Sequence, residues 1–193
     1  MATIFESIKA GDIDAVRAAV EEDPAGAASR DENGRSAVRA ALYAQKQDIA
    51  DIVLEAKPEL DVFDAAAVGD VDRLTELLDA DADLISSYSE DGYTPLHFAA
   101  FFARGSAVRL LLDRGADVGA VSRNEMEVQP LHSAVAANAR EVVAALLLAG
   151  ADVNARQHGG YTPLMAAEQH DDEEMVRLLM DHGAEESAEV PTE

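Results

Sequence analysis

A pattern of apolar positions at helical spacing recurs along most of the chain. In its clearest copy, residues 94–100 read Thr-Pro-Leu-His-Phe-Ala-Ala, so the leucine and the alanines share one face of a helix. A second helix is predicted to follow, because Val108, Leu111 and Leu112 also fall on one face. The pattern therefore predicts a unit of helix, turn, helix and extended loop.

The ends of these two helices carry recognisable signals. Thr94 has the side chain of a helix N-cap, and Pro95 follows at the first helical position, where its missing N–H costs nothing. Gly115 is placed to end the second helix in a left-handed conformation. A unit of this size is too small to bury its own apolar face, so each unit must stack on its neighbours.

Six units of this kind can be placed along the sequence, and we expect them to form one domain over residues 1–184. Their boundaries are 2–35, 36–59, 60–93, 94–128, 129–161 and 162–184, and their helix starts are marked at Ala2, Ser36, Leu60, Thr94, Gln129 and Thr162. The second unit is shorter than the others, so we expect only a short turn before the third. Residues 185–193 are polar and acidic and are expected to form a flexible tail.

Glycine-containing dipeptides mark the loops that precede the helix pairs. Asn33-Gly34 and Asp91-Gly92 are strong hairpin signals, so we expect short β-hairpins to project there. Asp81 stands where a glycine would end the second helix of the third unit. Aspartate tolerates the left-handed conformation better than most residues, so we expect that conformation at Asp81.

Residues 94–99 resemble the ankyrin repeat, because Thr-Pro-Leu-His-Phe-Ala matches the family signature Thr-Pro-Leu-His-x-Ala in full. Residues 129–135 and 162–167 are weaker copies of the same signature. The resemblance implies an all-α solenoid of helix-turn-helix units with short β-hairpin loops. It also implies a non-enzymatic protein-protein interaction module. In such a module His97 and His132 would hydrogen bond adjacent hairpins to one another.

Composition narrows the possible functions. The chain has no cysteine, which excludes disulfides, thiolate metal ligands and cysteine nucleophiles. Its formal net charge of −23 argues against nucleic acid and anionic membranes; it allows a basic partner protein, and the alternative is that the charge serves solubility. No phosphate-binding glycine loop or catalytic motif occurs, so we expect no enzyme activity, cofactor or metal ion. No signal peptide or long apolar span is visible, so a cytoplasmic protein is expected.

The resemblance places partner binding on the concave face, at the hairpin tips and at the two residues after each alanine pair. Phe101 and Phe102 are the expected anchors, and at least one of them should be exposed; the alternative is that both pack against a neighbouring repeat. The candidate binding residues are Tyr43, Tyr93, Phe101, Phe102, Asn124, Met126, His158, Tyr161 and Gln169. We expect a monomer that acts as an inhibitor or adaptor.

Two other functions are compatible with the sequence. The stretch from Asp79 to Glu90 has acidic residues at several spacings of a calcium-binding loop, although Leu84 stands where such a loop needs glycine. It suggests a calcium-binding or calcium-sensing protein as one alternative. The other alternative is a self-associating scaffold.

Overall fold

The computed structural model describes residues 3–186, which form twelve α-helices and three short 3-10 helices. No strand is assigned in this part of the chain, and one antiparallel β-bridge joins Arg30 to Ser36. None of these helices is long and apolar enough to cross a membrane. The helices divide into two compact units, the first ending at Asp64 and the second beginning at Ala65. The predicted all-α fold is confirmed, and the single domain over residues 1–184 stays a prediction.

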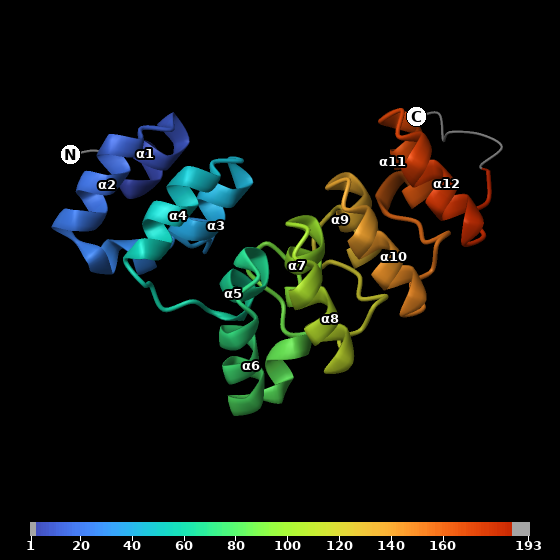
Figure 1. Cartoon of the computed structure of the whole chain (residues 1–193), viewed down its shortest axis with the longest axis horizontal. Helices are drawn as coiled ribbons and strands as arrows, with labels where there is room; N and C mark the ends of the chain where they lie inside the picture. The colour runs from blue at the N-terminus through green and yellow to red at the C-terminus, as the bar shows by residue number, and fades with distance from the viewer. Residues whose placement is uncertain (1–2, 187–193) are drawn as a thin grey trace. The chain divides into compact units, whose positions relative to one another are not determined.

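The first unit contains two helix pairs that pack on each other (Figure 1). They are α1 (Ile4–Ala10) with α2 (Ile13–Glu22), and α3 (Ala37–Tyr43) with α4 (Gln47–Glu55), and the 3-10 helix η1 (Pro24–Ala28) follows α2. Fully buried Val16, Val38 and Val53 lie in its core. A connection without further helix, residues 56–61, leads to α5 (Val62–Val68), which begins in the first unit and ends in the second.

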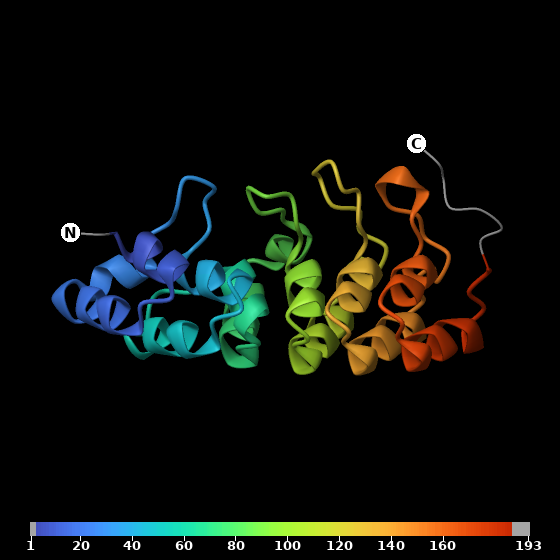
Figure 2. The ribbon, with the colours of Figure 1, turned by 90° about the horizontal axis from the view of Figure 1, so that it is seen from above.

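The second unit is built from helices that stand in two rows. The inner helices are α7 (Pro95–Phe101), α9 (Pro130–Ala136) and α11 (Pro163–Gln169), and the outer helices are α8 (Gly105–Asp113), α10 (Arg140–Leu148) and α12 (Glu173–Asp181). Ahead of them come α6 (Val71–Ala80) and the 3-10 helix η2 (Ala82–Ser86), and η3 (His158–Gly160) precedes α11. Figure 2 shows that the loops before α7, α9 and α11 project on the same side of this unit. Buried Leu96, Leu111, Leu131 and Leu146 fill the space between the rows.

The inner helices begin at the predicted residues, but the first helices of two other repeats begin one residue later than marked. Thr94 and Thr162 cap α7 and α11 as expected, each with its hydroxyl accepting an N–H from the first turn. In the first unit, however, Thr3 caps α1 in place of the marked Ala2. In the third repeat, residues 60–93, Asp61 caps α5 in place of the marked Leu60, since its carboxylate accepts the Asp64 N–H at 2.7 Å. Both corrections move the cap by one residue, because an oxygen-bearing side chain displaces an apolar one.

In four helix pairs, a non-glycine residue just after the first helix takes a left-handed conformation. These residues are Gln45, Ala103, Asn138 and Asp171, with φ of 57°, 56°, 52° and 54°. This conformation costs such residues roughly 1–2 kcal/mol each. At Ala103 the chain still closes the helix end, because the Arg104 N–H donates to the Ala99 carbonyl oxygen at 2.8 Å. The alanine therefore adopts the glycine geometry and leaves the repeat register unchanged.

Candidate partner-binding face

Three successive loops of the second unit are hydrogen bonded to one another at their ends (Figure 2). The Arg123 N–H donates to the Gly92 carbonyl oxygen at 2.8 Å, and the His158 N–H donates to the Met126 carbonyl oxygen at 3.0 Å. We call these loops, residues 89–93, 122–128 and 157–161, the tip row. Because backbone groups make the links, the tip row is a preformed surface whose spacing does not depend on flexible side chains.

Asn124 strengthens the link between the first two tips. Its side-chain amide N–H donates to the Asp91 carbonyl oxygen at 2.9 Å, and its side-chain oxygen accepts the Met126 N–H at 3.0 Å. The side chain is half-buried. Asn124 stays a predicted partner contact, and its amide adds to the backbone link between the first two tips.

His97 and His132 lie beneath the tip row and tie it to the inner helices. The Nε2 atom of His97 is 3.0 Å from the Val128 carbonyl oxygen, and that of His132 is 3.2 Å from the Ala155 carbonyl oxygen. A carbonyl oxygen can only accept, so Nε2 carries the proton in both rings and Nδ1 is left as an acceptor. In His97 that acceptor takes the Thr94 N–H at 3.3 Å. The predicted role of these histidines is confirmed.

Both buried rings are held in the neutral form. Burial and, to a smaller extent, the neighbouring His132 lower the pKa of His97 to about 4, against the hydrogen bond to Val128, which raises it. Burial also lowers the pKa of His132. Protonation would place a second N–H on the His97 Nδ1 atom, where it would face the Thr94 N–H. The links beneath the tip row therefore need neutral imidazoles.

The chain should lose stability in mild acid because of His97. An unfolded histidine binds a proton below about pH 6.5 and the folded one only near pH 4, so the free energy of unfolding falls as pH drops through this window. Across the whole window the free energy of unfolding falls by roughly 3 kcal/mol, and above about pH 6.5 it is not reduced. Urea unfolding of wild type and His97→Gln between pH 7 and pH 4.5 checks this. The variant should lose less stability across the window; parallel curves would contradict the assignment.

An aromatic pair ends the first of the inner helices. The rings of Phe101 and Phe102 meet edge to face, with centroids 5.1 Å apart and planes at 84°. Phe101 is 39% exposed, and Phe102 is half-buried. The expectation that at least one of them is exposed is confirmed for Phe101. The pair thus presents an apolar edge to solvent while its second ring supports the first.

The remaining predicted binding residues are spread over both units. Met126 and His158 are exposed on the tip row, and Gln169 is exposed at the end of α11. Tyr93 and Tyr161 are half-buried where their loops lead into the inner helices. The Tyr93 ring packs against the rings of His97 and Phe98, with centroids 5.7 Å and 5.9 Å away. Part of its surface is therefore buried against these core residues.

Tyr43 lies in the first unit, apart from this set. The Arg35 guanidinium lies 5.9 Å from the centre of its ring. Both residues line a hollow of about 690 Å³ between the loop 31–35 and the helices α1 and α3. The first unit therefore has its own recess on the side of its loop.

Comparisons with known proteins were made for the whole sequence. A family model described as ankyrin repeats (3 copies) matches residues 62–157, and one described as ankyrin repeat matches residues 159–189. Together they cover well over half of the chain.

The chain belongs to the ankyrin repeat family.

The chain is also similar to segments of much longer proteins. It is 42% identical over 108 residues to the Neurogenic locus Notch protein of Drosophila melanogaster, a match that covers 55% of this chain. It is 40% identical over 119 residues, or 61% of this chain, to human Neurogenic locus notch homolog protein 4. The matched segments are only 4% and 6% of those much longer proteins. A crystal structure of an ankyrin repeat domain from Acinetobacter baumannii superposes with a TM-score of 0.59 and is 28% identical, covering 94% of this chain and 98% of that one.

The helix pair α3 and α4 departs from the signature, and the buried ion pair that results was not predicted from the sequence. Arg39 stands where His97 stands in the signature copy, and its Nε donates to the Asp64 carboxylate at 2.6 Å. The Ser36 hydroxyl donates to the same oxygen at 2.7 Å. Burial and the nearby Asp61 carboxylate raise the pKa of Asp64, against the opposing effect of Arg39. An arginine in the histidine position was the signal that could have revealed this buried pair.

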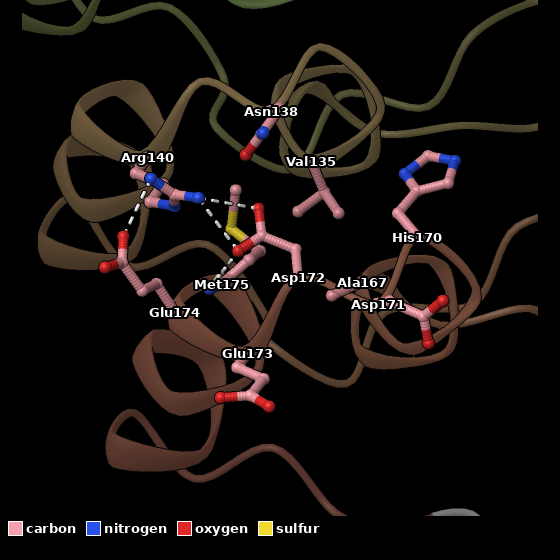
Figure 3. Close-up of a pocket in the computed structure, with 10 residues that line it drawn as sticks. All are labelled: Val135, Asn138, Arg140, Ala167, His170, Asp171, Asp172, Glu173, Glu174 and Met175. Carbon is pink, nitrogen blue, oxygen red and sulfur yellow. Dashed lines mark hydrogen bonds and ion pairs between the residues drawn. The ribbon is translucent and has the colours of Figure 1, made fainter.

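A hollow of about 450 Å³ lies between the last two ankyrin units (Figure 3). Figure 3 shows Arg140 reaching across to Asp172, and two hydrogen bonds of 2.9 Å and 3.0 Å join them. A second ion pair of 2.9 Å joins Arg140 to Glu174. The Met175 N–H and then Arg140 hold the pKa of Asp172 below its usual range. The arginine is therefore fully engaged in joining α10 to the start of α12.

The stretch proposed as a calcium loop is a helix end followed by a 3-10 turn. Asp79 pairs with Arg114 at 2.7 Å, and the Asp81 carboxylate accepts the Asp83 N–H at 3.0 Å as the cap of η2. Asp81 has φ −149°, so the expected left-handed conformation is wrong, because the chain enters η2 directly and needs no reversal. Between residues 3 and 186 no group of three or more acidic, histidine or cysteine side chains is arranged to hold a metal ion.

Proposed function

We propose that this ankyrin repeat chain is a non-enzymatic protein-binding module and that its second unit carries the binding face. The observation that carries the proposal is the exposed Phe101, held edge to face by Phe102 at the end of α7. Partly exposed aromatic residues on a rigid support are typical binding hot spots. Met126 and His158 on the tip row would contact the same partner, with Tyr93 and Tyr161 at its edge.

The tip row supports this proposal by being ordered in advance. Its backbone hydrogen bonds leave few rotatable groups to immobilise on binding, which lowers the entropic cost of association. The partner would be basic, since a chain of net charge −23 attracts cations over long range. The binding face is complete within one copy of the chain. Covering a partner's own active or binding surface would make the module an inhibitor, and leaving it open would make it an adaptor.

Phe101→Ser should weaken partner binding at least about tenfold, because losing a hot-spot side chain costs more than about 1.4 kcal/mol. Ile13→Ser is the matched control, since Ile13 is 42% exposed and Phe101 39%, and Ile13 lies on α2 of the first unit. Partner proteins are captured from native lysate at low salt by wild type and both variants, and the captured protein is then titrated. Circular dichroism verifies folding.

Two results would contradict the proposal. One is equal retention of the same partner by wild type and folded Phe101→Ser. The other is equal loss by Phe101→Ser and Ile13→Ser, which would mean that exposed apolar surface in general is responsible. Raising the salt concentration should release a basic partner, because screening weakens attraction between exposed charges.

A further inference from the structure

The outer helices of the second unit present one flat series of equivalent positions. The helices α8, α10 and α12 each have nine residues, and α10 packs against both of the others (Figure 1). The fifth and ninth residues of each helix lie one turn apart on its outward side. They are Arg109 and Asp113 on α8, Ala144 and Leu148 on α10, and Arg177 and Asp181 on α12.

The central helix of this series is apolar on its outward side. Leu148 is 82% exposed at a position where both neighbouring helices carry aspartate. Half-buried Ala144 and Leu147 continue the apolar surface along α10, and exposed Met180 extends it onto α12. The nearest charge on α10 itself is Glu141, almost a turn before Ala144. An apolar helix face flanked by charges is typical of a protein-protein interface.

The flanking helices carry matching charges that are not engaged in ion pairs in the described part of the chain. Each has an arginine followed four residues later by an aspartate, Arg109 with Asp113 and Arg177 with Asp181. All four side chains are exposed, and none forms an ion pair within residues 3–186. The two cations balance the two anions. Exposed Glu173 and Glu174 add negative charge at the start of α12.

We propose that this face binds a second copy of the chain, related by a twofold axis that crosses the outer helices. The axis would set each outer helix antiparallel to the same helix of the second copy and would cross it midway between its fifth and ninth residues, so that Leu148 would face the partner subunit's Ala144. Arg109 would then face the partner subunit's Asp113, and Arg177 would face the partner subunit's Asp181. A twofold contact uses the same surface on both copies, and this face is complementary to itself.

The charge pattern selects this arrangement over the parallel one. With the axis along the helices, α8 would lie on the partner subunit's α12, and arginine would face arginine. Only the antiparallel arrangement pairs every arginine with an aspartate. Pairing arginine with aspartate at these positions also offsets part of the repulsion between two strongly acidic chains. The inference replaces the expected monomer with a weak dimer, and it leaves the tip row free for the partner of the proposed function.

The first test is sedimentation equilibrium of the full chain, wild type beside Leu148→Asp. Wild type should dimerise in the micromolar range, and Leu148→Asp should raise the dissociation constant about 100-fold, because each copy loses one buried leucine and gains a charge. Aspartate is already present at this position on α8 and α12, so the variant should fold. Ile13→Asp, an exposed apolar residue of the first unit, should leave the constant unchanged. A wild type that stays monomeric into the millimolar range would overturn the proposal.

The second test reads the antiparallel arrangement directly. One variant carries Arg109→Asp and Arg177→Asp, and the other carries Asp113→Arg and Asp181→Arg. Each variant alone should be monomeric, since like charges would face each other across the axis. An equal mixture should form a mixed dimer as tightly as wild type. Self-association of either variant alone, no association in the mixture, or a mixed dimer much tighter than wild type would overturn the antiparallel geometry, because parallel helices would set arginine against arginine in wild type and arginine against aspartate in the mixture.

Discussion

Replacing Arg39 by methionine is expected to lower the free energy of unfolding of the first unit by about 3–5 kcal/mol. Arg39 is 2% exposed and Asp64 1%, and the two groups are joined by a hydrogen bond of 2.6 Å. Removing the guanidinium leaves a carboxylate in the core with only the Ser36 hydroxyl beside it and an ion pair to Arg30 of 3.5 Å. An uncompensated buried charge is far more costly than the pair itself is stabilising.

The measurement is urea unfolding of three variants beside wild type. Arg39→Met should show the full loss, and Arg39→Met/Asp64→Leu should recover most of it, since both charges are then gone and apolar side chains of similar volume remain. Arg17→Met is the control, because the pair between Arg17 and Glu55 is exposed and 3.5 Å long. Its loss should stay below about 1 kcal/mol. A double variant as unstable as Arg39→Met would show that the buried charge is not the cause.

Replacing Gly92 by alanine is expected to cost about 3 kcal/mol and to break the link between the first two tips. Gly92 has φ +84°, and a Cβ atom there would lie 2.9 Å from the Arg123 carbonyl carbon and 3.1 Å from its oxygen. The obstacle is backbone, so it cannot rotate away as a side chain can. The hydrogen bond from the Arg123 N–H to the Gly92 carbonyl oxygen must then lengthen.

Gly115→Ala separates the cost of a left-handed conformation from the cost of the steric clash with the Arg123 backbone. Gly115 has φ +88°, and a Cβ atom there would meet nothing within 4 Å, so only the conformational cost of about 1–2 kcal/mol applies. In urea unfolding, Gly92→Ala should have a clearly lower free energy of unfolding than Gly115→Ala. Amide hydrogen exchange at Arg123 should quicken in Gly92→Ala alone. Equal stabilities with unchanged exchange at Arg123 would show that the tips do not depend on this close approach.

The tip row and the Arg39 pair show two ways of holding neighbouring ankyrin units together. Beneath the tip row, neutral His97 and His132 bond to backbone carbonyl oxygens. In the first unit, Arg39 bonds to a buried carboxylate and to the Gly34 carbonyl oxygen at 3.1 Å. The histidine links depend on pH through the imidazoles, whereas the arginine stays protonated throughout.

Local signals in the sequence were sufficient for the helices and their order. Thr94, Pro95 and Gly115 act within a single turn, so their effect is readable without knowledge of the rest of the chain. The apolar stripes also predicted the stacking, because such short units cannot bury them alone. The one-residue errors at Thr3 and Asp61 arose because a repeat register follows the apolar residues, whereas the helix start follows the nearest capping oxygen.

Only the tertiary structure decided which of these side chains are available for binding. The sequence allowed Phe101 to be either exposed or packed, and the fit of neighbouring repeats left its edge in solvent. Asn124 is a candidate contact whose amide is also engaged by the adjacent tip. Arg39 and Asp64 lie 25 residues apart, so their pairing depends on how one helix pair sits on the next. Apolar periodicity and capping are short-range effects and can be read from the chain, but exposure and pairing across repeats depend on contacts between distant segments.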